Sequence, residues 1–273
     1  MAAPSNLAVR LATAAVCVPL ILLLLYRGPA WGFYALVAPA AVIGTWELFA
    51  MTHPGDRVAQ YIGAFLGAVA SLAVYFGGHD PRVLVTILVA LPVLGLLATL
   101  TRLGTIETAA LRAFAMGFGP LWVAVPLTLL ALMRKDMEHD GASYVVMTMM
   151  FAWWGDTGGY FAGRFLGKRK LYEAVSPKKT VEGAIGGLGG SVLGALCAHF
   201  WYLPSIPLAH AVPLSLVAGA LGQAGDLGES LVKRSTGVKD SGQIVPGHGG
   251  ILDRVDALIV ASAVVFLYVQ WIR

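Results

Sequence analysis

Six acidic residues lie inside stretches of the chain that are otherwise apolar enough to cross a membrane. They are Glu47, Asp156, Asp226, Glu229, Asp253 and Asp256. An aspartate near the centre of a membrane helix costs about 2.5–3.5 kcal/mol on insertion scales. Five of the six occur in the sixth, eighth and ninth stretches, which predicts a shared polar cavity. Glu47 lies close to the end of its stretch, so we expect its carboxylate to face lipid headgroups.

The spacing of these acids predicts that they share helix faces. Asp226, Glu229 and Lys233 follow an i, i+3, i+7 pattern, and Asp253 and Asp256 follow i, i+3. Two carboxylate-bearing faces that converge form a site for a hard cation. Oxygen ligands suit Mg²⁺, which binds through few carboxylates together with water and substrate phosphate. The chain has no His and Cys cluster at zinc spacing.

A glycine-rich segment precedes the last apolar stretch. It reads Val-Pro-Gly-His-Gly-Gly over residues 245–250, with His248 between glycines. Glycines let backbone N–H groups approach an anion closely, and a helix N-terminus follows directly, so the segment is suited to cradle a phosphate. Glycine-rich turns between membrane helices are also common, and a single histidine in such a turn is often only a loop residue.

A second polar segment is basic and rich in hydroxyl groups. Lys168, Arg169 and Lys170 are followed by Ser-Pro-Lys-Lys-Thr at residues 176–180. Ammonium and hydroxyl groups in a short turn can hold a phosphate. The alternative is an anchor on anionic lipid, to which such a segment also contributes. Upstream, glycines at 155, 159 and 163 have the four-residue spacing that lets membrane helices approach closely.

The composition requires a bilayer to position these residues. The chain of 273 residues is 58% hydrophobic and only 12% charged, with a mean hydropathy of +0.75. Soluble domains carry about a quarter charged residues. The net charge of +4 comes from few basic residues between apolar blocks, so membrane topology explains it better than nucleic-acid binding. Cys17 and Cys197 lie in apolar runs, where buried thiols are expected rather than a disulfide or a zinc site.

Nine windows of about 20 apolar residues, the length that spans a bilayer as a helix, predict the architecture. They fall at about 7–26, 29–51, 58–76, 83–100, 112–133, 142–166, 183–203, 211–232 and 251–272. Their apolar runs are continuous rather than alternating, which argues against strands. We therefore expect an all-α, polytopic membrane helical bundle with about nine transmembrane helices. The first window lacks a small-x-small cleavage site, so we expect a retained span rather than a signal peptide.

The positive-inside rule gives an orientation. Nine spans place five of the 19 Lys and Arg residues on one side: Arg27, Arg82, Arg134, Lys135 and Arg273. The other fourteen lie on the side of the N-terminus, together with both large polar loops. This predicts a cytoplasmic N-terminus and an external C-terminus. We expect residues 1–135 to form a scaffold for dimer or lipid contacts, and residues 136–273 to form the catalytic region.

One motif resembles a known family. Ser230, Lys233 and Arg234 are followed by Lys-Asp at 239–240 and by Pro-Gly-His-Gly-Gly-Ile-Leu-Asp-Arg-Val-Asp at 246–256. This resembles the pattern S-x-x-K-R-x(4)-K-D, a short spacer, then P-x-H-G-G-x-x-D-R-x-D of phosphatidate cytidylyltransferases (CDP-diacylglycerol synthases). The segments at 156–160 and 176–183 resemble the family's second conserved block. The resemblance covers most of the C-terminal half.

The resemblance implies a membrane enzyme that makes CDP-diacylglycerol and pyrophosphate from CTP and phosphatidic acid. It also implies Mg²⁺ bound at Asp226 and Asp253, a homodimer, and room for a monovalent cation such as K⁺. Combined with the charge pattern, it gives three sets of candidate residues. The catalytic set is Asp226, Lys233, Lys239, Asp253, Arg254 and Asp256. The metal set is Asp226, Asp253 and Asp256. The substrate-binding set is Ser176, Lys178, Lys179, Thr180, Ser230, Arg234, His248, Gly249 and Gly250.

Other functions place carboxylates in membrane helices too. An ion-coupled transporter does so, but it needs neither the glycine-rich loop nor the basic loop on the same side. A CTP-dependent polyprenol kinase would share the nucleotide and transfer its γ-phosphate instead. A CDP-alcohol phosphotransferase is disfavoured because its D-G-x-x-A-R motif is absent, and a scaffold would gain nothing from five costly carboxylates.

Overall fold

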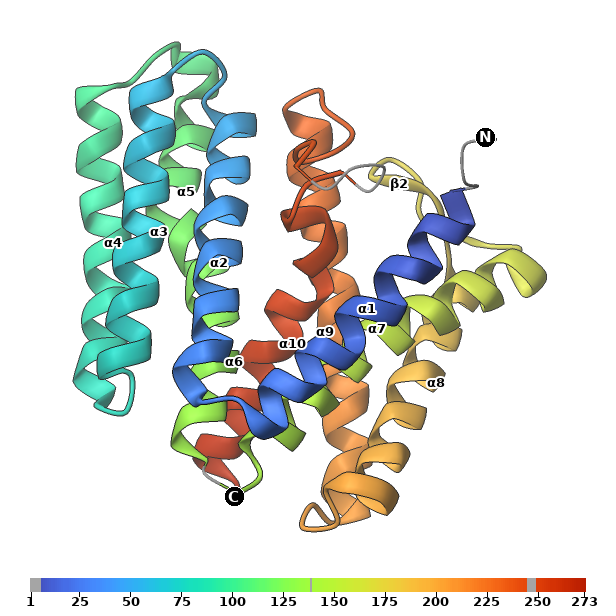
Figure 1. Ribbon diagram of the computed structural model, residues 1–273. Helices are drawn as coiled ribbons and strands as arrows, with labels where there is room; N and C mark the ends of the chain where they lie inside the picture. The colour runs from blue at the N-terminus through green and yellow to red at the C-terminus, as the bar shows by residue number, and fades with distance from the viewer. Residues whose placement is uncertain (1–5, 138, 245–248) are drawn as a thin grey trace, which may run out of the picture.

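A computed structural model describes residues 6–137, 139–244 and 249–273 (Figure 1). Over these residues the chain is almost entirely helical. The helices are α1 (Asn6–Arg27), α2 (Ala30–Thr52), α3 (Arg57–Gly77), α4 (Pro81–Thr101), α5 (Ile106–Trp122), α6 (Ala124–Asp136), α7 (Gly141–Leu166), α8 (Val181–Cys197), the π-helical turn η1 (Ala198–Tyr202), α9 (Leu208–Ser235) and α10 (Leu252–Trp271). Two short strands, β1 (Lys170–Tyr172) and β2 (Ser176–Thr180), connect α7 to α8.

The helices confirm a polytopic helical membrane protein. Within the described ranges, six helical segments are long and apolar enough to cross a bilayer. Each of the nine apolar windows contains a helix, but the fifth is divided between α5 and α6 at Val123. Large apolar side chains point outward, as on α4, where Leu88 is 61% and Leu97 is 54% exposed. A surface of this kind fits hydrocarbon rather than water. The number of spans stays a prediction.

The ends of the helices collect on two sides of the bundle. In Figure 1 the connections after α2, α4, α7 and α9 lie in the upper part, and those after α1, α3, α6 and η1 lie at the bottom. This is the alternation that nine consecutive crossings would give. The basic segment at 168–180 and the described residues between α9 and α10 therefore lie on one side, the side from which α1 begins.

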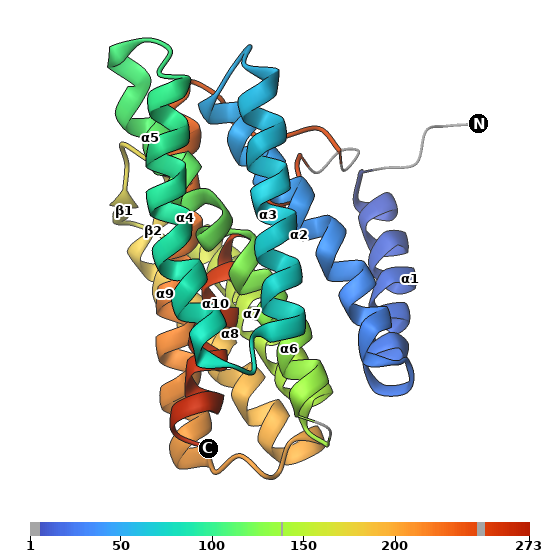
Figure 2. The ribbon, with the colours of Figure 1, turned by 90° about the vertical axis from the view of Figure 1, so that its left-hand side faces the viewer.

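Two groups of helices form the bundle (Figures 1 and 2). Helices α2, α3, α4 and α5 contact one another, and α7, α8, α9 and α10 pack in chain order. Helix α6 joins the two groups through contacts with α2, α3, α7 and α10. Leu130, Leu132 and Met133 of α6 are each 1% exposed, so this helix is the buried centre of the apolar core.

An ionic contact ties the ends of α3, α4 and α5 together. Asp56 caps the N-terminus of α3 by accepting a bond from the backbone of Ala59. Its carboxylate also pairs with Arg102 at 2.7 Å and with Arg112 at 2.8 Å. The hydrogen bond from Arg102 is the main cause that lowers the pKa of Asp56 to about 2. Asp56 therefore stays ionised at any physiological pH and holds the neighbouring ends of α3, α4 and α5 together.

Glycines bring α7 and α8 into backbone contact, which confirms the prediction from their spacing. A Cβ atom on Gly155 would lie 3.0 Å from Ser191 Oγ of α8, and one on Gly159 would lie 3.4 Å from the carbonyl oxygen of Gly183. Membrane helices gain no hydrophobic drive to associate, so close packing of small residues supplies the attraction. The polar segment at 168–180 connects these two closely packed helices.

The basic segment is a β-hairpin, a structure that the sequence analysis did not predict. Strands β1 and β2 pair antiparallel, with Lys170 opposite Thr180 and Tyr172 opposite Ser176. Thr180 then caps α8, because its hydroxyl accepts a bond from the backbone of Gly183 at 3.1 Å. The strand therefore runs directly into the helix, and this fixes the direction of the lysines that precede Thr180.

Adjacent glycines of α8 allow a controlled test of the packing. A Cβ at Gly190 would lie 2.1 Å from the backbone oxygen of Trp154, whereas a Cβ at Gly189 would have no atom within 4 Å. We expect Gly190→Ala to lower the free energy of unfolding by about 1–3 kcal/mol through overpacking. Gly189→Ala should leave it unchanged or raise it by up to about 1 kcal/mol through helix propensity. Unfolding midpoints in detergent measure both, and equal midpoints would contradict the packing.

Candidate functional site

Three carboxylates of α9 and α10 meet inside the bundle. One oxygen from each of Asp226, Glu229 and Asp256 lies within 4.8 Å of the others. The two helices approach closely because α9 has glycines at the contact. A Cβ on Gly225 would lie 2.5 Å from a methyl group of Val260. Small residues on α9 therefore bring its acidic face against that of α10.

This group fits a divalent cation. Three carboxylates so close in an apolar bundle repel one another, and the repulsion is relieved by protonation or by a cation. Glu229 is 1% exposed, and its Oε1 atom has no hydrogen-bond partner among the described residues. The donors are all oxygen atoms, the type that Mg²⁺ prefers. The group Asp226, Glu229 and Asp256 could therefore hold Mg²⁺.

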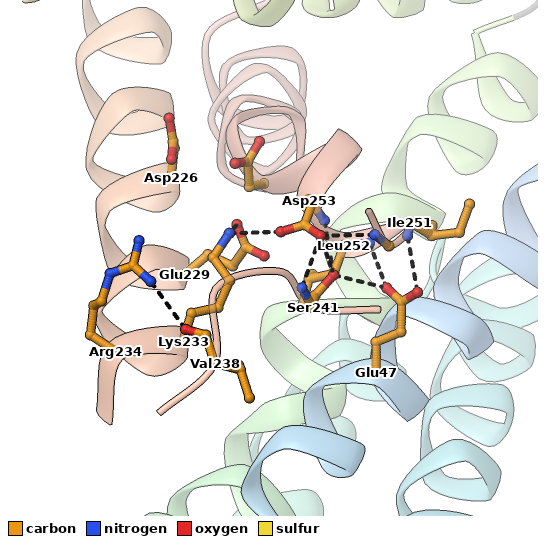
Figure 3. A network of polar contacts seen from close by, with 12 residues as sticks. Glu47, Asp226, Glu229, Lys233, Arg234, Val238, Ser241, Ile251, Leu252 and Asp253 are labelled. Atoms are coloured by element: carbon orange, nitrogen blue, oxygen red, sulfur yellow. Dashed lines mark hydrogen bonds and ion pairs between the residues drawn. The ribbon is translucent and has the colours of Figure 1, made fainter. Parts of the chain in front are cut away.

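Asp253 has different surroundings from those assumed for a metal ligand. Its Oδ1 accepts a bond from Lys233 Nζ at 2.7 Å. Its Oδ2 accepts bonds from the backbone and the hydroxyl of Ser241, both at 2.9 Å, and from the backbone of Gly250 at 2.8 Å. In this geometry Asp253 joins Ser241 and Gly250 to the first turn of α10 (Figure 3). Glu229, which the sequence analysis did not assign to the metal, takes its place beside the other two carboxylates.

Lys233 connects the two parts of the site. Its ammonium group lies 3.0 Å from Glu229 Oε2 and 2.7 Å from Asp253 Oδ1. The residue is only 8% exposed, so these ion pairs are screened little by water. Lys233 therefore fixes the distance between the carboxylate group and the loop.

A pocket of about 380 Å³ with several charged side chains in its lining lies next to the carboxylates. This volume is within the range of small-molecule sites. Its polar lining comes from α7, β2 and α9: Asp156, Arg164, Lys178, Lys179, Thr180, Gln223 and Asp226. Lys179 Nζ is 2.5 Å from Asp226 Oδ2, so the hairpin is joined to the carboxylate group. Gly155, Gly159 and Gly163 of α7 and Gly183 of α8 also line the pocket.

The remaining predicted residues are distributed around this centre. Arg234 donates to the carbonyl oxygens of Val175 and Val238, so it links the hairpin to the chain after α9. Ser230 is buried within α9, whereas Lys239 and Arg254 are exposed. Ser176 begins β2, outside the pocket lining. His248 lies outside the described residues. Gly249 has a φ of +84°, a conformation suited to glycine, and Gly250 donates to Asp253.

Several residues of the site were not assigned from the sequence. Arg164 and Gln223 line the pocket. The sequence offered a reason to assign Gln223 to the site, because this residue precedes Asp226 by three positions and so lies on the same face of α9. Ser241 lies in the short spacer between the two parts of the motif and was assigned no role. The expectation that Glu47 faces headgroups is wrong. Its side chain is 1% exposed and accepts a hydrogen bond from the start of α10. A contact between segments so far apart in the chain cannot be predicted from each apolar stretch taken alone.

The fold and this site define a class: polytopic helical membrane proteins with a carboxylate group between two helices, beside a pocket lined by charged side chains. The model of the cytidylyltransferase family matches residues 8–272, and the chain belongs to that family.

Curated relatives agree with this. A phosphatidate cytidylyltransferase of Brucella suis biovar 1 (strain 1330) is 45% identical over 140 residues, which cover 51% of each protein. Proteins of the same name are 44% identical over 135 residues in Synechocystis sp. (48% of this chain and 45% of the relative). In Bacillus subtilis (strain 168) the identity is 42% over 137 residues, 49% of each. The chain thus spans about half the length of the curated relatives it matches.

Cation binding at the carboxylate group is testable without an activity assay. We expect Mg²⁺ to raise the unfolding midpoint of the purified protein, since a ligand that binds only the folded state stabilises it by about 2.7 kcal/mol at one hundred times its Kd. Asp256→Asn should remove most of this effect. Glu107→Gln, an exposed acid at the start of α5, is the control and should retain it. An equal Mg²⁺ response in wild type and Asp256→Asn would contradict the site.

Proposed function

We propose that the chain transfers the CMP moiety of CTP to phosphatidic acid, giving CDP-diacylglycerol and pyrophosphate. The observation that most supports this is the 2.5 Å ion pair of Lys179 and Asp226. It joins a pocket lined by Arg164, Lys178 and Lys179 to a carboxylate group suited to Mg²⁺. The names of the relatives support the same reaction.

The reaction needs alignment and charge neutralisation more than a base. An oxygen of the lipid phosphate, already anionic, attacks the α-phosphorus of CTP. A P–O bond forms there, and the bond to the bridging oxygen breaks, so the electron pair leaves with pyrophosphate. The main obstacle is repulsion between two polyanions. Arg164, Lys178 and Lys179 provide positive charge around the pocket, and their role is to hold phosphate oxygens near the carboxylate group.

The other residues of the site have positioning roles. Asp226, Glu229 and Asp256 would hold Mg²⁺, with Asp253 ordering the adjacent loop. When bound, the cation would neutralise phosphate charge and stabilise the leaving pyrophosphate. Lys233 keeps the loop at a fixed distance from these carboxylates. Gly250 donates its backbone N–H to Asp253, so its role is to position the chain that leads into α10.

The membrane setting completes the proposal. The acyl chains of the substrate would stay in the bilayer, with the site opening sideways at the interface. We propose a bacterial-type inner membrane, with the N-terminus and the site cytoplasmic and the C-terminus outside. The excess of Lys and Arg on the side of the polar loops supports this orientation. A homodimer, a second cation such as K⁺, and a scaffold role for residues 1–135 belong to the same proposal.

Labelled CTP separates the possible reactions. With purified protein, Mg²⁺ and phosphatidic acid, label at the α-phosphate should enter the lipid, and label at the γ-phosphate should leave as pyrophosphate. Transfer of the γ-label to a polyprenol would identify a kinase instead. Uptake of an ion into vesicles without CTP consumption would identify a transporter. Either of these outcomes, without α-label in lipid, would refute the proposal.

The role of Lys179 predicts a substrate-binding defect. Lys179→Ala should raise the KM for CTP or for phosphatidic acid about tenfold or more, because hydrogen bonds to charged groups contribute about 1.5–3 kcal/mol. Lys168→Ala is the matched control. It removes an exposed lysine that precedes β1 and lies outside the pocket lining. Steady-state kinetics against both substrates measure the effect, and unchanged KM values for Lys179→Ala would argue against its contact with phosphate.

A further inference from the structure

Glu47 is a buried carboxylate that bonds to the first turn of a distant helix. It lies on α2 and is 1% exposed. Its Oε1 accepts a bond from the backbone of Ile251 at 3.1 Å, and its Oε2 accepts one from the backbone of Leu252 at 2.8 Å. The hydroxyl of Ser241 lies 3.2 Å from the same Oε2. Figure 3 shows these contacts meeting at one point.

The charge on Glu47 is compensated by a helix terminus. Among the described residues, no ion pair involves Glu47. A buried carboxylate without a cation is costly unless several N–H groups bond to it. The first N–H groups of a helix lack partners within the helix and carry partial positive charge. Glu47 therefore caps α10 from another part of the chain and is itself stabilised there.

Two glycines fit around this carboxylate. A Cβ on Gly250 would lie 2.5 Å from Glu47 Oε2, and a Cβ on Gly242 would lie 2.4 Å from Oε1. Either distance is too short for a real contact, so the loop can approach Glu47 only through glycine at both positions. Gly242 and Gly250 are thus fitted to an acidic side chain of α2.

The capping contact continues into the proposed site. The hydroxyl of Ser241 lies 2.9 Å from Asp253 Oδ2 and 3.2 Å from Glu47 Oε2, so one hydroxyl lies between two carboxylates. Asp253 in turn accepts from Lys233, which pairs with Glu229. A series of polar contacts therefore leads from α2 to the carboxylates of α9.

We propose that Glu47 is a positioning residue for the transfer reaction: it fixes the start of α10 and thereby holds Asp253 against Lys233. The inference rests on the proposed function for its kinetic consequence, and on the hydrogen bonds alone for its structural consequence. It assigns a role in the site to the N-terminal helices, which the sequence analysis regarded as scaffold.

The kinetic test uses Glu47→Gln in the full-length protein. Glutamine keeps the size of the side chain, but its amide nitrogen cannot accept a bond from α10. Displacement of Asp253 should release Lys233, and we expect the KM for CTP to rise about tenfold. A merely structural defect would lower the amount of active enzyme, and so Vmax, at an unchanged KM. Unchanged KM, with or without a lower Vmax, would overturn the proposal.

Two further variants keep the test decisive. Ser241→Ala removes the bridging hydroxyl but leaves the bonds of Glu47 to Ile251 and Leu252, so it should raise the same KM even if Glu47→Gln folds poorly. Combined with Glu47→Gln, its effect should be less than multiplicative, because both act on Asp253. Glu107→Gln is the control and should match wild type. A fully multiplicative effect of the two substitutions on KM would also overturn the proposal.

Hydrogen exchange tests the contact independently of activity. In Glu47→Gln the backbone amides of residues 249–253 should exchange at least tenfold faster than in wild type, while those in the second half of α10 should not change. Faster exchange in a protein that makes no CDP-lipid would refute the proposed function and leave the capping contact in place. Unchanged exchange in an active enzyme would refute the capping contact alone.

Discussion

The structure depends on how acidic side chains are compensated inside a helix bundle. Glu47 is stabilised by the N-terminus of α10, and Asp253 by Lys233 and by backbone N–H groups. Glu229 and Asp256 have less compensation of their charge. Lys233 pairs with Oε2 of Glu229, and Oε1 of Glu229 has no hydrogen-bond partner among the described residues. The negative charge that lacks a compensating partner is thus concentrated where Glu229 and Asp256 meet. A bound cation would supply the missing charge there, whereas the fully compensated carboxylates hold the surrounding loop.

Glycines make this arrangement possible in two ways. In a bilayer, apolar side chains gain little by leaving lipid for a neighbouring helix, so helix association depends on close contact and on polar bonds. Gly225 lets α9 approach α10 until their carboxylates meet, and Gly159 lets α7 approach α8. Gly159 and Gly183 of this contact also line the pocket. The close contact of α7 with α8 therefore forms part of the pocket wall.

The sequence predicted the parts of this molecule that depend on local pattern. Long apolar windows became helices, and the i, i+3 spacing correctly placed Asp226 and Glu229 on one face of α9. It could not show which acid of α10 would face them, because that depends on how the two helices are rotated about their axes. Asp256 faces the group and Asp253 faces the loop. The hairpin at 170–180 was also not predicted, since its strands are three and five residues long and polar. Glu47 was misjudged because its partners are 204 and 205 residues further along the chain.

The contact of Glu47 also bears on how the two groups of helices are aligned. Apolar contacts between α2 and α10 allow sliding or rotation at little cost, because lipid is an equally good neighbour. A carboxylate that accepts two backbone bonds from a helix terminus allows only one register, and a shift by one residue would leave a buried charge unpaired. The same bonds order the loop that carries Gly250 and Asp253. Alignment of α2 with α10 and the position of Gly250 and Asp253 therefore depend on the same hydrogen bonds.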